Sequence, residues 1–253
     1  MSTSEEITAN DRRVRSLVLA SAVPFLLVGL VVGLLVGGPI VGVLLGLVLA
    51  GAASWAVARA GDGRVAAAVG GRRADVATEA RLHNLVDSLC AAAGVPRPTL
   101  LVVEDAAPNA LAFGIDPKHA TLAVTTGLLE GLERVELEGV LAREVARIKH
   151  HDTRPATTAV ALLSLVGGFG ALGRRITAIA AGGGATLADA NGVALTRYPP
   201  GLIAALEKLL ADERVVTAGS RATAHLWLEP PSVGSTTSPH PPLEERIAAL
   251  REL

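Results

Sequence analysis

Two long stretches without a charged residue lie close together near the start of this 253-residue chain. Residues 16–36 and 40–58 contain 21 and 19 uncharged positions, separated only by a Gly-Gly-Pro connector. About 20 apolar residues span the hydrocarbon core of a bilayer, so each stretch is long enough to cross it. A cleaved signal peptide has a shorter apolar region, and a hairpin buried in a soluble core has polar faces. We therefore predict a transmembrane helical hairpin over residues 16–59.

Arginines flank this hairpin on both sides, whereas its connector has none. The flanking cations are Arg12, Arg13, Arg15, Arg59, Arg64, Arg72 and Arg73. Because positively charged flanks stay on the cytoplasmic side, the pattern predicts a multi-pass protein of the cell membrane. It also predicts a cytoplasmic N-terminal tail over residues 1–15 and a cytoplasmic main domain over residues 74–253. The lipid bilayer is the first partner that the sequence predicts.

A third apolar stretch, residues 156–173, is also uncharged but only 18 residues long and rich in glycine. Arg174 and Arg175 interrupt it before a further apolar run. Two crossings need roughly 40 residues and only about 27 are available, while one crossing would split the main domain across the membrane. We therefore expect an apolar, membrane-associated insertion at about 156–183 that lies at the interface or enters the bilayer shallowly.

The rest of the chain has the hydrophobic patterns of an α+β domain that is mainly helical with a small β-sheet. Helices are expected at 74–94, 134–151, 201–211 and 242–252, a strand at 99–105, and a strand leading into a helix at 120–132. The chain has 23 basic and 24 acidic residues, and aromatic residues make up only 2% of it. Neither a strong positive charge nor a stacking surface is present, so nucleic acid is not an expected partner.

The stretch LEGVLAREVARIKHHDT, residues 137–153, resembles a zinc-peptidase helix. Such helices use His-Glu-x-x-His, in which two imidazoles at i and i+4 share a face and bind Zn²⁺ while the Glu polarises the metal-bound water. Here the same frame contains Arg143, Glu144 and Arg147. Glu144 therefore stands at a vestigial general-base position, between two residues that cannot coordinate a cation.

Several further blocks resemble one family in order and spacing, together with the leading hairpin. They include RLHNLVDSLCAAAGVPRP, APNALAFGIDPKHATLAVTTGLLEGL, LADANGVALTRYPPGLIAALEKL and HPPLEERIAALREL. The family is that of the HtpX-type integral membrane zinc metallopeptidases, relatives of the CAAX prenyl proteases. The resemblance implies a zincin-like domain, a zinc ion held by two His and a downstream Glu, and cleavage of membrane proteins in quality control.

The three family zinc-ligand positions do not contain zinc ligands in this chain. Arg143 and Arg147 replace the two His, and Ala185, four residues before Asp189, stands where the family has the Glu. A guanidinium stays protonated and has no lone pair free for a metal. The remaining histidines are scattered, and the adjacent pair His150 and His151 points to different sides of its helix. We therefore predict no zinc and no other cofactor.

Asp189 matches the family aspartate that orients the first zinc-binding His. Without a metal, Glu144 and Asp189 would be two acidic groups in one half-buried cleft, which is costly. We therefore expect an ion-pair cluster in which Arg143 pairs with Asp189, while Arg147 or Arg143 engages Glu144. The alternative is that both guanidinium groups point to solvent.

The segments that shape the substrate groove in the family are also present. By resemblance, Asn109, Ala110, Leu122 and Val124 belong to this groove and its edge strand, which could bind an extended peptide without cleaving it. These segments could equally be kept because the fold needs them.

Three functions remain open. The first is an inactive, membrane-anchored pseudopeptidase that binds or regulates a membrane or cytoplasmic protein partner. The second is an active membrane zinc metalloendopeptidase with an unrecognised set of ligands. The third is a structural subunit of a membrane complex, with the glycine-rich hairpin packed on other helices.

Overall fold

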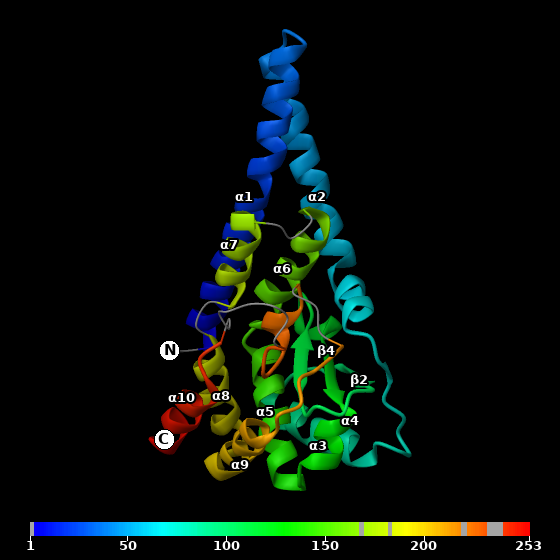
Figure 1. The fold of residues 1–253 in the computed structure, drawn as a ribbon, viewed down its shortest axis with the longest axis vertical. Helices are drawn as coiled ribbons and strands as arrows, with labels where there is room; N and C mark the ends of the chain where they lie inside the picture. Colours follow the sequence, from blue (N-terminus) through cyan, green and yellow to red (C-terminus); the bar gives the residue numbers. More distant parts are fainter. Residues whose placement is uncertain (1–2, 167–169, 182–183, 219–221, 232–239) are drawn as a thin grey trace.

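Helices form most of this molecule, with one small β-sheet near its centre (Figure 1). The computed structural model describes residues 3–166, 170–181, 184–218, 222–231 and 240–253. The predicted fold class, mainly helical α+β with an N-terminal apolar hairpin, is confirmed.

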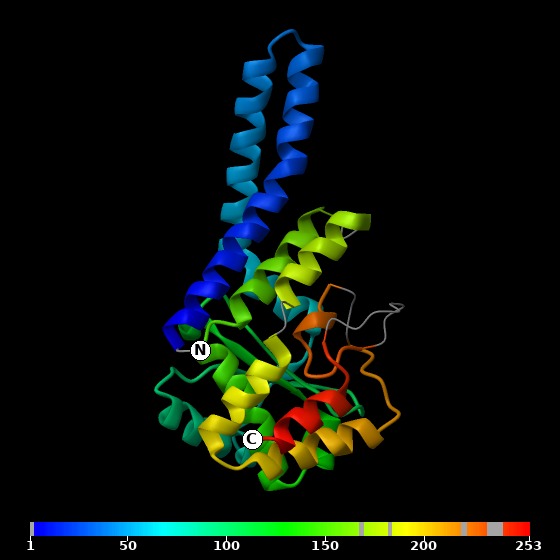
Figure 2. The ribbon, with the colours of Figure 1, turned by 90° about the vertical axis from the view of Figure 1, so that its left-hand side faces the viewer.

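The N-terminal hairpin projects from the domain as two long helices, α1 (Thr3–Leu35) and α2 (Pro39–Val69) (Figure 2). Both are long and apolar enough to cross a membrane, and most of the exposed large apolar side chains lie on them. The segment expected as an N-terminal tail is helical from Thr3 and continues into the apolar part of α1 without a break. The start of α1 and the end of α2 lie beside the domain in both views.

Glycines bring α1 and α2 into backbone contact. A Cβ placed on Gly42 would lie 2.2 Å from the carbonyl oxygen of Gly29, and one placed on Gly33 would lie 2.8 Å from the Cα of Gly42. A Cβ placed on Gly46 would likewise lie 2.8 Å from the carbonyl oxygen of Phe25. These glycines therefore serve the contact between the two helices of the hairpin itself.

The sheet contains four strands within the described residues, in the order β1-β2-β4-β3. Their bounds are β1 Arg72–Arg73, β2 Thr99–Val103, β3 Ala110–Phe113 and β4 Thr121–Thr125. β2 and β4 are parallel, whereas β1 with β2 and β3 with β4 are antiparallel. The two edge strands are therefore β1 and β3, and β4 lies inside the sheet with a partner on each side.

The helices of the domain surround α5 (Arg134–Lys149), which contacts α3, α8, α9 and β3. The other helices are α3 Ala80–Ala93, α4 Thr126–Gly131, α8 Gly184–Thr196, α9 Pro199–Ala211 and α10 Leu243–Arg251, with 3₁₀ turns η1 Pro117–His119 and η2 Ala224–Leu226. A capping box between Glu133 and Glu136 fixes the start of α5. The main core lies between α3, α5, α9 and the sheet, which makes α5 a rigid support for its polar residues.

The third apolar stretch forms a pair of helices, α6 (Thr153–Val166) and α7 (Gly170–Ala181). Both contact α1, and α6 also contacts α2. Leu17 of α1 is fully buried in a cluster with apolar residues of α6 and α7. Neither helix has 18 residues, which agrees with the length argument against a full crossing by either alone. Parts of the expected insertion, 167–169 and 182–183, lie outside the described residues.

Candidate functional site at the centre of α5

Three charged side chains lie inside the protein on α5, a helix that is otherwise mostly apolar. Arg143, Glu144 and Arg147 are 1%, 0% and 7% exposed. Removing such groups from water costs several kcal/mol each unless opposite charges and hydrogen bonds compensate. Their partners therefore decide what this site can do.

The carboxylates of Glu144 and Asp189 supply that compensation. Arg143 donates from Nε to Asp189 Oδ1 at 2.7 Å and from Nη1 to Glu144 Oε1. Arg147 donates from Nη1 to Glu144 Oε2 at 2.7 Å. Both oxygens of Glu144 therefore accept from arginine, and neither guanidinium points away to solvent.

A third arginine, Arg246 of α10, completes what we call the arginine–carboxylate cluster: Arg143, Arg147, Arg246, Glu144 and Asp189. Arg246 donates to Asp189 from Nε at 2.7 Å and from Nη2 at 2.8 Å. Burial alone would raise the pKa of Asp189, but Arg143 and Arg246 outweigh it and hold this pKa below its usual value. Three buried cations face two buried carboxylates, so the cluster has an excess of one positive charge.

Sequence reasoning missed Arg246, because it lies 57 residues after Asp189 on a helix with an ordinary amphipathic pattern. Its position in the sequence was a usable signal. Arg246 falls on the apolar face of α10, at helical spacing from Leu243 and Leu250, and this face is buried.

Gly192 lets α8 approach α5 closely enough for these contacts. A Cβ at Gly192 would lie 2.7 Å from the Cα of Arg143. Asp189 precedes Gly192 by about one helical turn, so it faces the same side of α8. The close approach therefore places the Asp189 carboxylate beside the Arg143 guanidinium.

The donor set at this site does not fit zinc. Zinc needs about four N, O or S lone pairs, at least three of them from the protein. Arg143 and Arg147 have donors only, and Ala185 has no polar side-chain atom. Among the described residues, no three His, Cys, Asp or Glu side chains gather in a way that could hold a metal ion.

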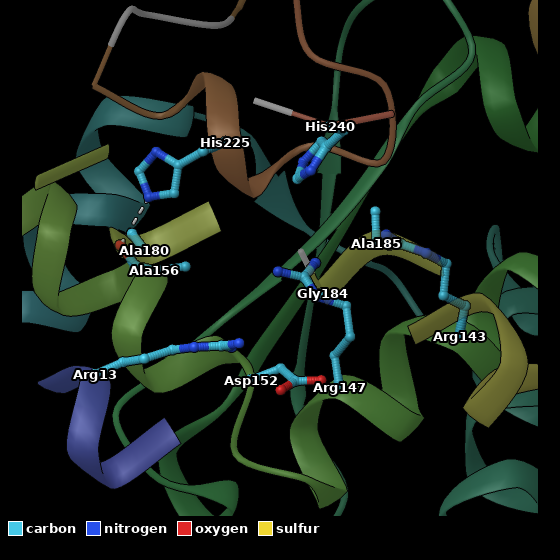
Figure 3. Close-up of a pocket in the computed structure, with 10 residues that line it drawn as sticks. All are labelled: Arg13, Arg143, Arg147, Asp152, Ala156, Ala180, Gly184, Ala185, His225 and His240. Carbon is cyan, nitrogen blue, oxygen red and sulfur yellow. Dashed lines mark hydrogen bonds between the residues drawn. The ribbon is translucent and has the colours of Figure 1, made fainter. Parts of the chain in front are cut away.

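A small cavity of about 30 Å³ lies against the cluster, and we call it the arginine pocket (Figure 3). Its walls come from α1, α5, α6, α7, α8, η2 and the turns before α6 and α10. They comprise Arg13, Arg143, Arg147, Asp152, Ala156, Ala180, Gly184, Ala185, His225 and His240. Arg147 enters it from α5, and His240 enters it from the opposite side. The three positions at which the resemblance implies zinc ligands, Arg143, Arg147 and Ala185, therefore all line one cavity.

The two histidines of the pocket are neutral at physiological pH. Burial, with Arg147 nearby, lowers the pKa of His225 to about 4, and His225 Nε2 lies 3.1 Å from the carbonyl oxygen of Ala156. Burial and the charges of Arg143, Arg147 and Arg246 lower the pKa of His240 to about 3. Sequence analysis treated both as scattered single residues, and only the fold brings them together.

The expected groove residues lie in the interior. Asn109 is 2% exposed, and Ala110, Leu122 and Val124 are completely buried. The sequence expectation of an open edge strand is therefore wrong here: Leu122 and Val124 belong to β4, which is paired on both sides, and their side chains lie in the core.

A segment of the chain itself covers the outer edge of β3. Leu111 and Trp227 form an antiparallel bridge, and Leu228 N donates to Ala110 O at 2.8 Å. The side chain of Asn109 binds the next residue of this segment, because its Nδ2 donates to Glu229 O at 2.7 Å.

The cluster also binds this covering segment. Arg147 Nη1 lies 3.2 Å from Leu226 O, and Arg246 Nη1 lies 2.9 Å from Leu228 O. The cluster therefore forms buried, charge-assisted hydrogen bonds that join α5, α8, α10 and the segment on β3.

The start of α1 attaches to the same region. Glu6 accepts from Asn191 at 3.0 Å and pairs with His150 Nδ1, while Asn10 donates to Asp152 Oδ1 at 2.5 Å and to His150 O at 3.1 Å. Glu6 and Asn10 are 3% and 2% exposed. The hairpin and the candidate site are thus joined by buried polar contacts.

Comparison with known proteins finds relatives over most of the domain. The model of Peptidase family M48 matches residues 76–253. A protein named Protease HtpX homolog from Dictyoglomus thermophilum is 38% identical over 206 residues, which cover 67% of this chain and 68% of the relative. Proteins of the same name from Tropheryma whipplei and Listeria monocytogenes are 37% and 33% identical, over 68% of this chain and 72% and 73% of theirs.

Proposed function

This chain belongs to peptidase family M48 as a homologue of the HtpX proteases, and from that premise we propose that it is a pseudopeptidase. In this proposal it is anchored in the cell membrane, lacks zinc-dependent peptidase activity and acts by binding another protein. The observation that carries the proposal is the occupation of the ligand positions by two buried arginines, both bound to carboxylates.

The state of Glu144 supports the loss of catalysis. A general base must reach the proton that it removes, either directly or through one water molecule. Both carboxylate oxygens of Glu144 already accept hydrogen bonds from guanidinium groups, and its side chain is fully buried.

The charge balance supports a structural role for the former catalytic centre. A zinc ion brings two positive charges, and Arg143 and Arg147 bring the same number to the same wall of the cavity. Glu144 and Asp189 therefore keep cationic partners without a metal. In this proposal the cluster stabilises the domain where the family has its reaction centre.

The apolar hairpin supports a place in the membrane, with the domain on the cytoplasmic side as the flanking arginines predict. The partner that we propose is a membrane or cytoplasmic protein. Strand addition at β3 is not part of this proposal, because Trp227 and Leu228 already cover that edge.

Zinc content tests the proposal. The full-length protein, purified in detergent, is compared by elemental mass spectrometry with the triple variant Arg143→His, Arg147→His, Ala185→Glu. We expect no zinc in the natural protein and about one zinc per chain in the variant, because the variant restores two imidazoles and one carboxylate around the cavity. A variant with Arg143→Gln and Arg147→Gln is the control that removes the cations without adding ligands.

Peptidase activity on unfolded protein is measured on the same samples. Stoichiometric zinc in the natural protein, with metal-dependent cleavage, would overturn the proposal in favour of an active membrane metalloendopeptidase. Zinc in the triple variant alone supports a conserved scaffold with a disabled metal site.

A further inference from the structure

The wall of the arginine pocket carries more guanidinium groups than carboxylates. The cluster beside it has three buried arginines and two buried carboxylates. Among the lining residues, three are arginines and Asp152 is the acidic one. The cavity therefore favours an anion.

We propose that the arginine pocket binds a carboxylate group, with Arg143 and Arg147 as its main ligands. This inference rests on the proposed function, because it requires the two arginines in place of a metal. The ligand class is a carboxylate, supplied either by a small organic acid or by the free C-terminus of a peptide.

Unused hydrogen-bond donors on buried side chains carry the proposal. Within the described part of the chain, Arg147 makes its hydrogen bonds through Nη1, and its Nε and Nη2 have no acceptor. Arg143 likewise uses Nε and Nη1, and its Nη2 has no acceptor among the described residues. Guanidinium groups bind carboxylates through paired N–H donors, so two such groups on one wall suit this ligand.

The size of the cavity restricts the ligand. A volume of about 30 Å³ accommodates one or two water-sized groups, which corresponds to the two oxygens of a carboxylate. Gly184 and Ala185 keep the space open, because neither has a side chain larger than a methyl group. At neutral pH, His225 and His240 add no charge and border the site with neutral imidazoles.

Binding of acetate tests the proposal directly. Full-length protein in detergent at neutral pH is titrated against ¹³C-acetate, and binding is followed by broadening of the acetate NMR signal at constant ionic strength. We expect saturable broadening, because a carboxylate exchanges in and out of the pocket. A short peptide with a free C-terminus is compared with its C-terminal amide to separate the two sources of the carboxylate.

Three variants assign any binding to the pocket. Arg147→Gln removes one of the two main ligands, and we expect acetate to bind at least about tenfold more weakly. Ala185→Val narrows the cavity without changing its charge, and we expect weaker acetate binding in this variant as well. Arg251→Gln is the matched control, because Arg251 is exposed and pairs with Glu207 on the surface.

The outcomes separate this inference from the proposed function. Metal-free protein that does not bind acetate, or binds it equally well after Arg147→Gln and Ala185→Val, would overturn the carboxylate site and leave the pseudopeptidase proposal intact. Stoichiometric zinc in the natural protein would overturn both. If the free-acid peptide competes with acetate and its amide does not, the source of the carboxylate is a protein C-terminus. If acetate binds and neither peptide competes, the source is a small organic acid.

Discussion

At the scale of single residues, the pseudopeptidase proposal makes arginine, in place of zinc, the source of positive charge at the site. A metal ion presents empty coordination positions to a substrate, whereas a guanidinium presents N–H donors in a fixed plane. Arg143 uses these donors to join Glu144 on its own helix to Asp189 on α8. In the proposed pseudopeptidase, the site therefore holds helices and a carboxylate ligand instead of activating water.

Part of this site could be predicted from the sequence. Resemblance led to a pairing of Arg143 with Asp189 and of an arginine with Glu144, and these side chains are in contact in the structure. Arg246, His225 and His240 could not be assigned, because nothing local in the sequence relates α10 or η2 to α5. Their positions depend on tertiary packing.

Asp189 tests the stabilising role of the cluster. Asp189→Asn leaves Arg143 and Arg246 with a neutral partner inside the protein, and breaking a buried pair in this way costs about 3–5 kcal/mol. We therefore expect a clear fall in the thermal unfolding midpoint of the protein in detergent. Asp212→Asn is the control, because Asp212 and Arg214 form a more exposed pair, and such pairs contribute about 0–1 kcal/mol. Equal midpoints for the two variants would contradict a stabilising cluster.

At the scale of helices and strands, the hydrophobic pattern identified most elements of the domain and missed β3 and α8. The helices predicted at 134–151 and 201–211 correspond to α5 and α9, whose apolar faces are well developed. β3 was missed because Ala110–Phe113 has only four residues, all buried, and therefore shows no alternation. α8 was missed because two glycines and several β-branched or small polar residues give it a weak helical signal.

The contact between α1 and α2 gives a prediction at this scale. Gly42→Ala places a Cβ 2.2 Å from Gly29 O, so the two helices must separate. We expect a lower thermal midpoint and faster proteolysis of the hairpin in lipid nanodiscs. Gly51→Ala is the matched control on the same helix, because a Cβ there meets no atom within 4 Å. A hairpin that tolerates both changes equally well would show that the close approach is not needed.

At the scale of the whole molecule, the hairpin is attached to the domain by more than chain connectivity. The first turns of α1 bury Glu6 and Asn10 against the end of α5 and the second half of α8. Sequence analysis treated this segment as a cytoplasmic N-terminal tail, because it precedes the first uncharged stretch and carries Arg12, Arg13 and Arg15. Their burial follows from partners on elements about 140 to 185 residues away, which a local pattern does not contain.

Asn10 tests this attachment. Asn10→Ala removes the donor to Asp152 and to His150 O, and leaves a buried acceptor unsatisfied at a cost of about 1–3 kcal/mol. We expect a lower unfolding midpoint together with faster hydrogen exchange in residues 3–13. Thr8→Ala is the control, because the Thr8 hydroxyl donates to Ser4 O on the exposed side of the same helix. Unchanged exchange in the Asn10 variant would mean that α1 is held by its apolar contacts alone.

The unbroken course of α1 also sets a distance. Arg13 lines the pocket, and the uncharged segment begins three residues later, at Ser16, which is about 4.5 Å along the helix axis. In the proposed membrane placement the bilayer begins at Ser16, so the pocket lies at the depth of the lipid headgroups. Extended chain spans about 3.3–3.6 Å per residue, so the carboxylate of a neighbouring membrane protein that ends a few residues beyond its transmembrane segment would lie within reach of the pocket. The position of Arg13 on α1 thus links the proposed carboxylate site to the membrane surface.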